Sequence, residues 1–230
     1  SLNQDSPRRL SIQRLADESG ATIVCGAPTS LALGIQRNSA YVFAPGALRP
    51  ARYDKYHLVP FGEYVPLYGP DYAHHFIPQG QGDFSPAPFP LALGELGILT
   101  CYEGAFPYLA RAMTGQGARV LVNISNDAWE KNTGEAEHHY VLARLRAIEC
   151  GRPFIRAGNV GVSAVVAPDG RVLARQDAWR AGHILASVPL GAGVTPALLF
   201  GDWVAWCSLL GSGLLLTAGA LENEYRRVHD

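Results

Sequence analysis

The sequence has no excess of positive charge. Its 230 residues include 19 Lys and Arg against 20 Asp and Glu, which gives a formal net charge of -1. The basic residues are also spread along the chain rather than clustered. Proteins that bind nucleic acids usually carry a basic patch that neutralises phosphates. We therefore expect no nucleic-acid partner.

Cysteine is scarce, and its spacing is not that of a metal site or a disulfide scaffold. The four cysteines are Cys25, Cys101, Cys150 and Cys207, and neither CxxC nor HExxH occurs. Structural zinc sites and disulfide-rich domains usually show short, regular spacings of their ligands. We expect no metal site and no cofactor. All the cysteines except Cys101 are interpreted as small apolar side chains.

The N-terminus lacks both an initiator methionine and the basic and apolar segments of a signal peptide. The stretch SLNQDSPRRL leads directly into an amphipathic helix, predicted over residues 6–19 and ended by Gly20. We therefore expect the sequence to be part of a longer protein.

The rest of the chain alternates between strand-like and helix-like segments. Strands are predicted within 21–27, 38–46, 93–103, 118–127, 153–159 and 181–190, with a hairpin over 161–176 and a further short strand beginning near 52. Helices are predicted over 106–117 and 138–152; in the second, Val141, Leu142, Leu145 and Ile148 share one face. Residues 67–90, rich in proline, glycine and aromatics, are predicted to form a long irregular loop, and such loops usually have a function. This order predicts a layered α/β domain over residues 1–190.

The C-terminal region contains a long run without charge. Residues 203–221 are 19 residues without Asp, Glu, Lys or Arg. As a helix they would reach about 28 Å, close to the ~30 Å thickness of a bilayer's hydrocarbon core. We predict a transmembrane helix here, joined to the domain by a linker at 191–202. The alternative is a buried core helix.

Arginines after this run predict its orientation. Arg226 and Arg227 lie just beyond it, and basic residues favour the cytoplasmic side of a membrane. We expect residues 222–230 to form a cytoplasmic tail and the domain to lie on the outer, periplasmic side of a bacterial inner membrane.

The candidate chemistry centres on Cys101, which ends the apolar run GILT at the carboxyl edge of a predicted strand. Ligands of open α/β sheets bind at that edge. Lys55, Glu63, Asn126 and the neighbouring Trp129 lie in other polar or aromatic stretches. A thiolate, a carboxylate and an ammonium can together perform acyl transfer, since they supply nucleophile, base and oxyanion partner.

Each of these residues also has a structural interpretation. A cysteine at a strand end can be a buried thiol, and Lys55 and Glu63 can be solvated charges. Asn126 and Asp127 suit a turn or a helix cap. The pair His138-His139 is predicted at a helix start, where capping or packing is a commoner role than ligation.

Three ordered motifs favour the functional interpretation. DKYHLVPFGEYVP, LTCYEGAFP and NISNDAW occur in this order in the nitrilase, or carbon-nitrogen hydrolase, superfamily. HLVPFGEYVPL, the segment HHYVLARLRAIECGRPFIRAGNVGVSAVVAPDGRV and the closing apolar run resemble its apolipoprotein N-acyltransferase branch. The resemblance implies an αββα sandwich, lacking its first strands in this sequence, followed by one transmembrane helix.

The resemblance also implies roles for individual residues. Cys101 matches the nucleophile, Lys55 the lysine of a Glu-Lys-Cys triad, and Glu63 a second, supporting glutamate. Tyr102 and Glu103 match the pair after the nucleophile, where the Tyr102 N–H would join the oxyanion hole. Asn126 and Trp129 are candidate substrate contacts. The family's general-base glutamate lies in a Trp-x-Glu stretch that would precede Ser1.

The implied reaction is a two-step acyl transfer. Cys101 would take an acyl chain from a phospholipid as a thioester and pass it to the α-amino group of the diacylglyceryl-cysteine of an apolipoprotein. Two alternatives remain: a nitrilase-type amidase or carbamoylase acting on small amides, and an inactive, membrane-tethered module.

Overall fold

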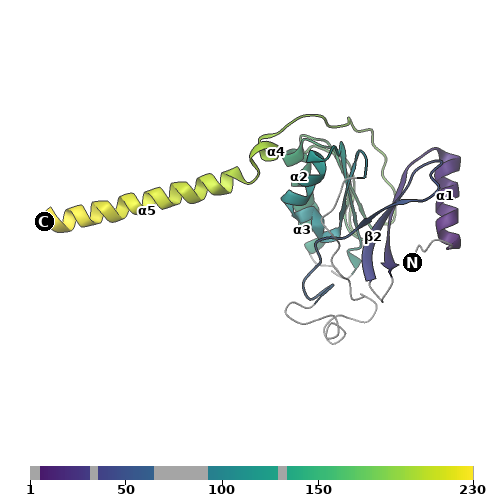
Figure 1. Cartoon of the computed structure of the whole chain (residues 1–230), viewed down its shortest axis with the longest axis horizontal. Coiled ribbons are helices and arrows are strands. Elements are labelled where there is room, and N and C mark those ends of the chain that lie inside the picture. The colour runs from purple at the N-terminus through teal and green to yellow at the C-terminus, as the bar shows by residue number, and fades with distance from the viewer. Residues whose placement is uncertain (1–5, 32–35, 65–92, 129–133, 230) are drawn as a thin grey trace.

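The computed structural model describes residues 6–31, 36–64, 93–128 and 134–229. Within them the chain forms two packed β-sheets with helices on the outer faces (Figure 1). The predicted loop at 67–90 and Trp129 lie outside the described residues. The predicted layered α/β sandwich is confirmed.

The smaller sheet is antiparallel and carries the first helix. Its strands are β1 (Ile23–Ser30), β2 (Gln36–Phe43) and β3 (Ala51–Asp54), in the order β1-β2-β3. Side chains alternate across β2, because successive residues of a strand point to opposite faces. Tyr41 and Phe43 pack against Ala16 of α1 (Pro7–Ser19), whereas Ala40 and Val42 join the core between the sheets. Helix α1 therefore covers the outer face of this sheet, and it ends at Gly20 (φ 67°) as predicted.

The larger sheet has the order β4-β5-β6-β7-β8. Its strands are β4 (Leu96–Thr100), β5 (Val120–Ser125), β6 (Phe154–Gly158), β7 (Ser163–Val166) and β8 (Val172–Gln176). The first three are parallel, so their carboxyl ends meet at one edge of the sheet. The last two form the predicted hairpin, which turns at Gly170 (φ 84°).

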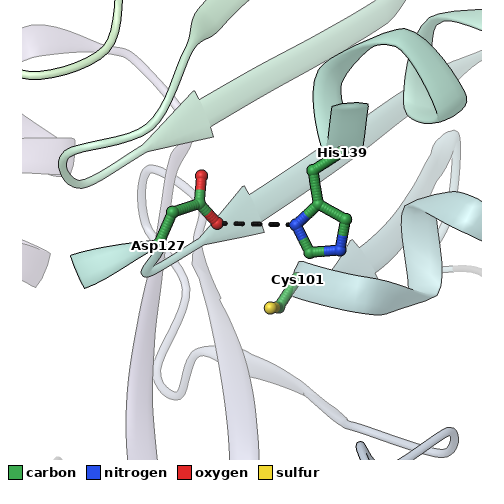
Figure 2. A group of neighbouring side chains, drawn as sticks. All are labelled: Cys101, Asp127 and His139. Carbon is green, nitrogen blue, oxygen red and sulfur yellow. Dashed lines mark ion pairs between the residues drawn. The ribbon is translucent and has the colours of Figure 1, made fainter. Parts of the chain in front are cut away.

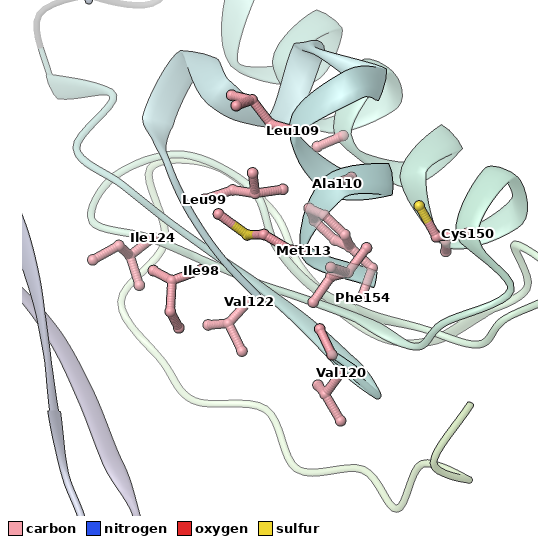
Figure 3. Close-up of a cluster of buried hydrophobic side chains, with 14 of the residues drawn as sticks. Ile98, Leu99, Leu109, Ala110, Met113, Val120, Val122, Ile124, Cys150 and Phe154 are labelled. Carbon is pink, nitrogen blue, oxygen red and sulfur yellow. The ribbon is translucent and has the colours of Figure 1, made fainter. Parts of the chain in front are cut away.

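Helices α2 (Pro107–Gly115) and α3 (Glu135–Cys150) cover the outer face of the larger sheet. Apolar side chains from α2, β4 and β5 make up much of the core, including Leu109, Met113, Ile98 and Val122 (Figure 3). At Gly97 a Cβ atom would lie 2.7 Å from Leu121 Cδ2, so glycine lets the helix and strands approach closely.

The face of α3 that packs against the sheet is not the face that carries its large apolar side chains. Val141, Leu145 and Ile148 share a face, as their spacing indicates, but they are 42–47% exposed. The buried positions include Ala143 and Ala147. Small side chains allow a helix to approach a sheet closely, so the larger apolar residues are left on the outer face.

The predicted strand over 181–190 is wrong. This segment has no regular secondary structure, and Leu185 is 93% exposed. A strand needs a neighbour to pair its N–H and C=O groups, and no described strand pairs with this segment.

The predicted linker at 191–202 contains the short helix α4 (Pro196–Phe200) and is docked on the domain. The Arg152 guanidinium donates to Gly193 O at 2.7 Å, and Thr195 Oγ1 donates to Glu149 O. The Arg111 guanidinium pairs with Asp202 at 2.8 Å. These contacts hold the start of the next helix against α2 and α3.

Helix α5 (Trp203–His229) leaves the packed layers (Figure 1). Within the described part of the chain it is the one helix long and apolar enough to cross a membrane. Its candidate span, Trp203–Arg227, has a mean hydropathy of 1.7 and is not buried against the rest of the chain. The alternative of a helix buried in the core of this domain is therefore wrong for the described residues. The helix also continues past Leu221, where the predicted span ends.

Candidate active site

Cys101 lies where the chain leaves the sheet. It directly follows β4 and begins the 3-10 helix η3 (Cys101–Ala105), with the positive φ of 52° that few non-glycine residues adopt. Such backbone strain persists only where the surrounding structure holds it, and it is most often found at functional sites. The predicted position at the carboxyl edge of a strand is confirmed.

Glu103 joins the turn of Cys101 to the loop that follows β3. Its carboxylate is fully buried and accepts four hydrogen bonds. Oε2 accepts from Tyr53 OH (2.7 Å) and Thr100 N (2.8 Å); Oε1 accepts from the backbone N–H groups of Tyr56 (2.8 Å) and His57 (3.0 Å). Burial raises the pKa of Glu103, while these donors and Lys55 oppose the rise. The carboxylate thus fixes Lys55, which directly precedes Tyr56, relative to Cys101.

Lys55 and Glu63 form an ion pair inside this loop. Lys55 Nζ lies 2.7 Å from Glu63 Oε2, and the lysine side chain is fully buried. Glu63 also accepts from Val59 N at 2.8 Å and from Asn38 Nδ2 at 2.9 Å. A buried ammonium needs such a partner, since an unpaired charge in an apolar interior is costly. The carboxylate therefore holds the Lys55 side chain in place.

The surroundings of Cys101 favour the protonated thiol over the thiolate. Burial raises its pKa above the ordinary value, and the charges of Asp127 and Glu63 raise it further. The Lys55 ammonium and a hydrogen bond with Ser125 lower the pKa, but the rise prevails. The thiolate is the reactive form, so nucleophilic attack requires a base that removes the proton.

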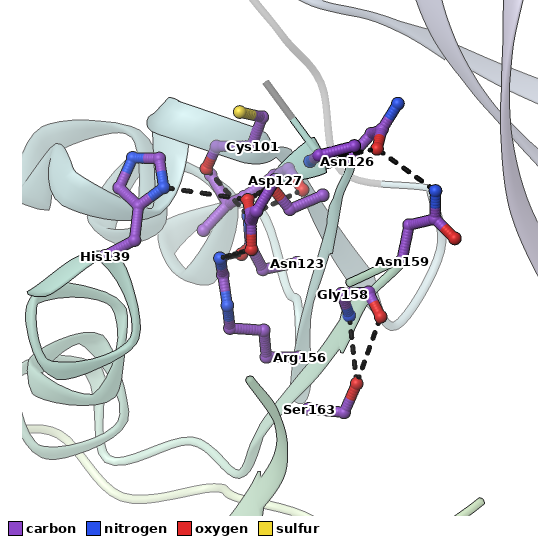
Figure 4. A network of polar contacts seen from close by, with 12 residues as sticks. Cys101, Asn123, Asn126, Asp127, His139, Arg156, Gly158, Asn159 and Ser163 are labelled. Atoms are coloured by element: carbon purple, nitrogen blue, oxygen red, sulfur yellow. Dashed lines mark hydrogen bonds and ion pairs between the residues drawn. The ribbon is translucent and has the colours of Figure 1, made fainter. Parts of the chain in front are cut away.

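A buried polar network lies next to Cys101 (Figure 4). Asn123 Nδ2 donates to Leu99 O and to Cys101 O, both at 3.1 Å. The Arg156 guanidinium donates to Asn123 Oδ1, and to Asp127 Oδ2 at 2.8 Å. Asn123 thereby clamps the strained turn from the neighbouring strand, and Arg156 orients Asn123.

Asp127 completes this network, and only glycine fits at position 161 beside it. A Cβ atom at Gly161 would lie 1.7 Å from Asp127 Oδ2, which no side chain permits. Burial opposes ionisation of Asp127, but a hydrogen bond with His139, the charge of Arg156 and a hydrogen bond from Ser125 hold its pKa below the usual value. The pair Asp127–Arg156 is therefore charged and buried.

Aromatic rings surround Tyr102, the residue after Cys101. The Tyr102 ring meets Phe106 edge-on with centroids 4.9 Å apart, and Phe106 lies 3.7 Å from the His57 ring. His57 Nδ1 shares a 2.9 Å hydrogen bond with Tyr108 OH. This cluster packs Tyr102 beside the loop that follows β3 and carries Lys55, here called the lysine loop.

Asn126 lies at the same edge of the sheet, directly after β5. Its Oδ1 accepts from Asn159 Nδ2 at 3.1 Å and from Ala128 N at 3.3 Å, and its side chain is exposed. The turn anticipated for this residue is present, and the exposed amide leaves it accessible to a ligand.

Sequence reasoning missed the network around Arg156. The available signal was a polar residue in an otherwise apolar strand: Asn123 in VLVNIS and Arg156 in FIRAG. Because buried polar groups need partners, two such residues on neighbouring strands indicate a pair.

Comparison with known proteins identifies the family to which this chain belongs. Residues 3–194 match the family model described as carbon-nitrogen hydrolase. Proteins named apolipoprotein N-acyltransferase from Geobacter metallireducens and Ralstonia nicotianae are 36% and 35% identical over 98% of this chain. The chain spans 44% of the length of each.

Solved structures share the fold. A carbon-nitrogen hydrolase from Helicobacter pylori G27 has a TM-score of 0.58 at 23% identity, covering 74% of this chain and 63% of its own. An amidase from Nesterenkonia sp. has a TM-score of 0.57 at 22% identity, covering 77% of this chain and 65% of its own. With the family match over most of its length, this chain belongs to the carbon-nitrogen hydrolase family.

Proposed function

We propose that this chain carries the catalytic part of an N-acyltransferase. The enzyme would move an acyl chain from a phospholipid to the α-amino group of the diacylglyceryl-cysteine of apolipoproteins. The observation that carries the proposal is the similarity to proteins of that name over 98% of the chain. The hydrolase family match ends at residue 194, so this similarity extends beyond it toward the membrane-length helix.

Cys101 is the nucleophile in this proposal. Its Sγ attacks the ester carbonyl of the phospholipid, a base takes the thiol proton, and the lysophospholipid alcohol leaves with a proton. The resulting thioester is then attacked by the acceptor amine, which yields the amide and restores the thiol. The raised pKa of Cys101 makes the base essential for the first step.

Lys55, Glu63, Tyr102 and Glu103 support this chemistry. The Lys55 ammonium, held by Glu63 at 2.7 Å, and the Tyr102 N–H stabilise the oxyanion of each tetrahedral intermediate. Glu103 is a positioning residue, because its hydrogen bonds fix the lysine loop. We assign substrate contacts to Asn126, which is exposed at the same edge of the sheet, and to Trp129, three residues further along the chain.

The donor experiment separates acyl transfer from amide hydrolysis. The full-length protein in detergent is incubated with phospholipid carrying a labelled acyl chain, without acceptor, and in parallel with small amides. We expect label bound to Cys101 that hydroxylamine releases, as a thioester requires, and no ammonia from the amides. Ammonia release without labelled protein would instead support an amidase.

We also propose the arrangement in the membrane. Residues 1–190 form the catalytic domain on the periplasmic side of a bacterial inner membrane, 191–202 the link, 203–221 the span and 222–230 a cytoplasmic tail. The two arginines of the tail support this orientation.

Protease added to intact spheroplasts tests the orientation. We expect it to digest the domain and to leave an epitope tag after Asp230 intact until the membrane is permeabilised. Digestion of the tag from the outside would reverse the orientation.

A further inference from the structure

Three side chains of types that bind metals, Cys101, Asp127 and His139, lie close together. Cys101 begins η3, Asp127 follows β5, and His139 lies in the first turns of α3 (Figure 2). Residues Cys101, Asp127 and His139 are 8%, 1% and 7% exposed. One donor atom of each, a sulfur, a carboxylate oxygen and an imidazole nitrogen, lies within 4.8 Å of the other two.

The spacing suits a small tetrahedral ion after minor adjustment. Zinc binds thiolate at about 2.3 Å and nitrogen or oxygen at about 2.0–2.2 Å, so neighbouring donors of a tetrahedral site are about 3.3–3.6 Å apart. Asp127 Oδ1 and His139 Nδ1 are 3.8 Å apart, close to this separation. Cys101 Sγ lies within 4.8 Å of both atoms, so a shift of its side chain toward them would complete a three-donor site.

The charges around the cluster also suit a divalent cation. Asp127 Oδ2 is held by Arg156 at 2.8 Å, which turns Oδ1 toward His139. A thiolate and this carboxylate together bring two negative charges to the ion. Sulfur, nitrogen and oxygen are all donors that zinc accepts in proteins, and three protein ligands leave a fourth position for water.

We propose that Cys101, Asp127 and His139 form an inhibitory Zn²⁺ site that blocks the nucleophile. As the ion binds, a sulfur–zinc bond forms, the thiol proton passes to the buffer, and no redox change occurs. The bound thiolate cannot attack a carbonyl, so zinc and acyl donor compete for Cys101. The inhibitory effect rests on the proposed acyltransfer, whereas the binding site itself does not.

The expectation of no metal site rested on the absence of closely spaced ligand motifs in the sequence. The members of this cluster are far apart in the sequence and form no such motif. Its members are 26 and 12 residues apart along the chain (101 to 127, 127 to 139) and meet only because the sheet edge and α3 bring them together. Packing or capping, the role anticipated for His139, leaves its ring in place to act as a ligand.

The experiment measures binding without catalysis. The full-length protein in detergent is titrated with Co²⁺, which gives a thiolate-to-metal charge-transfer band, and Zn²⁺ is then used to displace it. We expect one Co²⁺ per protein, no band in Cys101→Ser, and Zn²⁺ affinity at least about tenfold weaker in His139→Gln. In acylation assays, Zn²⁺ should inhibit the unaltered protein reversibly on addition of chelator. In His139→Gln, at least about tenfold more zinc should be needed to halve the acylation rate. The rate of each variant is expressed relative to its own rate without zinc.

His138 provides the matched control, because it is the neighbouring histidine on the same helix and is exposed. His138→Gln is expected to keep the band, the affinity and the inhibition. A band that persists in Cys101→Ser, or an equal loss in His138→Gln and His139→Gln, would overturn the site. Metal binding without any N-acylation would count against the proposed function alone.

Discussion

Replacement of Cys101 by alanine is expected to abolish the acyl-thioester and to lower N-acylation by at least about a thousandfold. In the proposed reaction the thiol is the nucleophile of the first half-reaction, and its thioester is the acyl donor of the second, so no later step can substitute for it. Alanine also has a Cβ, so the backbone at φ 52° carries the same strain as with cysteine. The measurement is transfer of labelled acyl chain to an apolipoprotein by the full-length protein in detergent.

The controls for this variant separate loss of chemistry from loss of structure. Cys207→Ser alters an exposed side chain on α5 and should retain the activity of the unaltered protein. Cys101→Ser should remain folded and nearly inactive, because a serine hydroxyl ionises far less readily than a thiol. If Cys101→Ala acylated its acceptor at more than a tenth of the normal rate, the nucleophile would have to be another residue.

The catalytic turn could be predicted because its signals are local in the sequence. An apolar run that stops at a cysteine predicts a strand with a thiol at its carboxyl edge, and β4 ends at Thr100. The hairpin over 161–176 follows from its Pro-Asp-Gly turn, and α1 ends at the predicted glycine. In these places the local pattern and the tertiary structure agree.

The contacts that hold the site could not be predicted, because they join distant segments. The Lys55–Glu63 pair is eight residues apart, but the hydrogen bonds that Glu103 accepts from β3 and the loop after it span 46 to 50 positions. The hydrophobic periodicity of α3 also indicates the wrong buried face. Ala143 and Ala147 approach the sheet, whereas Ile148 is exposed. Hydrophobicity ranks the faces of a helix, whereas close packing here selects small side chains.

Replacement of Arg156 by leucine is expected to destabilise the domain by about 3–5 kcal/mol. Arg156 is 1% exposed and pairs with Asp127, whose side chain is fully buried, at 2.8 Å. Removing the guanidinium leaves that carboxylate charged without its cation and takes a donor from Asn123, which clamps Cys101. The measurement is the free energy of unfolding of the full-length protein, from denaturant titration in detergent.

Two further variants test whether the lost charge is the cause. Arg171→Leu alters an arginine whose side chain is 71% exposed and should cost about 1 kcal/mol or less. Adding Asp127→Asn to Arg156→Leu should recover part of the stability, since it removes the uncompensated charge.

The pH dependence follows from the depressed pKa of Asp127. Because this pKa is lower in the folded state, its contribution to stability is full at neutral pH. That contribution is lost as the pH falls through the folded-state pKa. The difference between the unaltered protein and Arg156→Leu should therefore shrink in acid. A difference that stays constant from neutral to acidic pH, or a double variant less stable than Arg156→Leu, would mean that packing rather than charge holds the turn of Cys101.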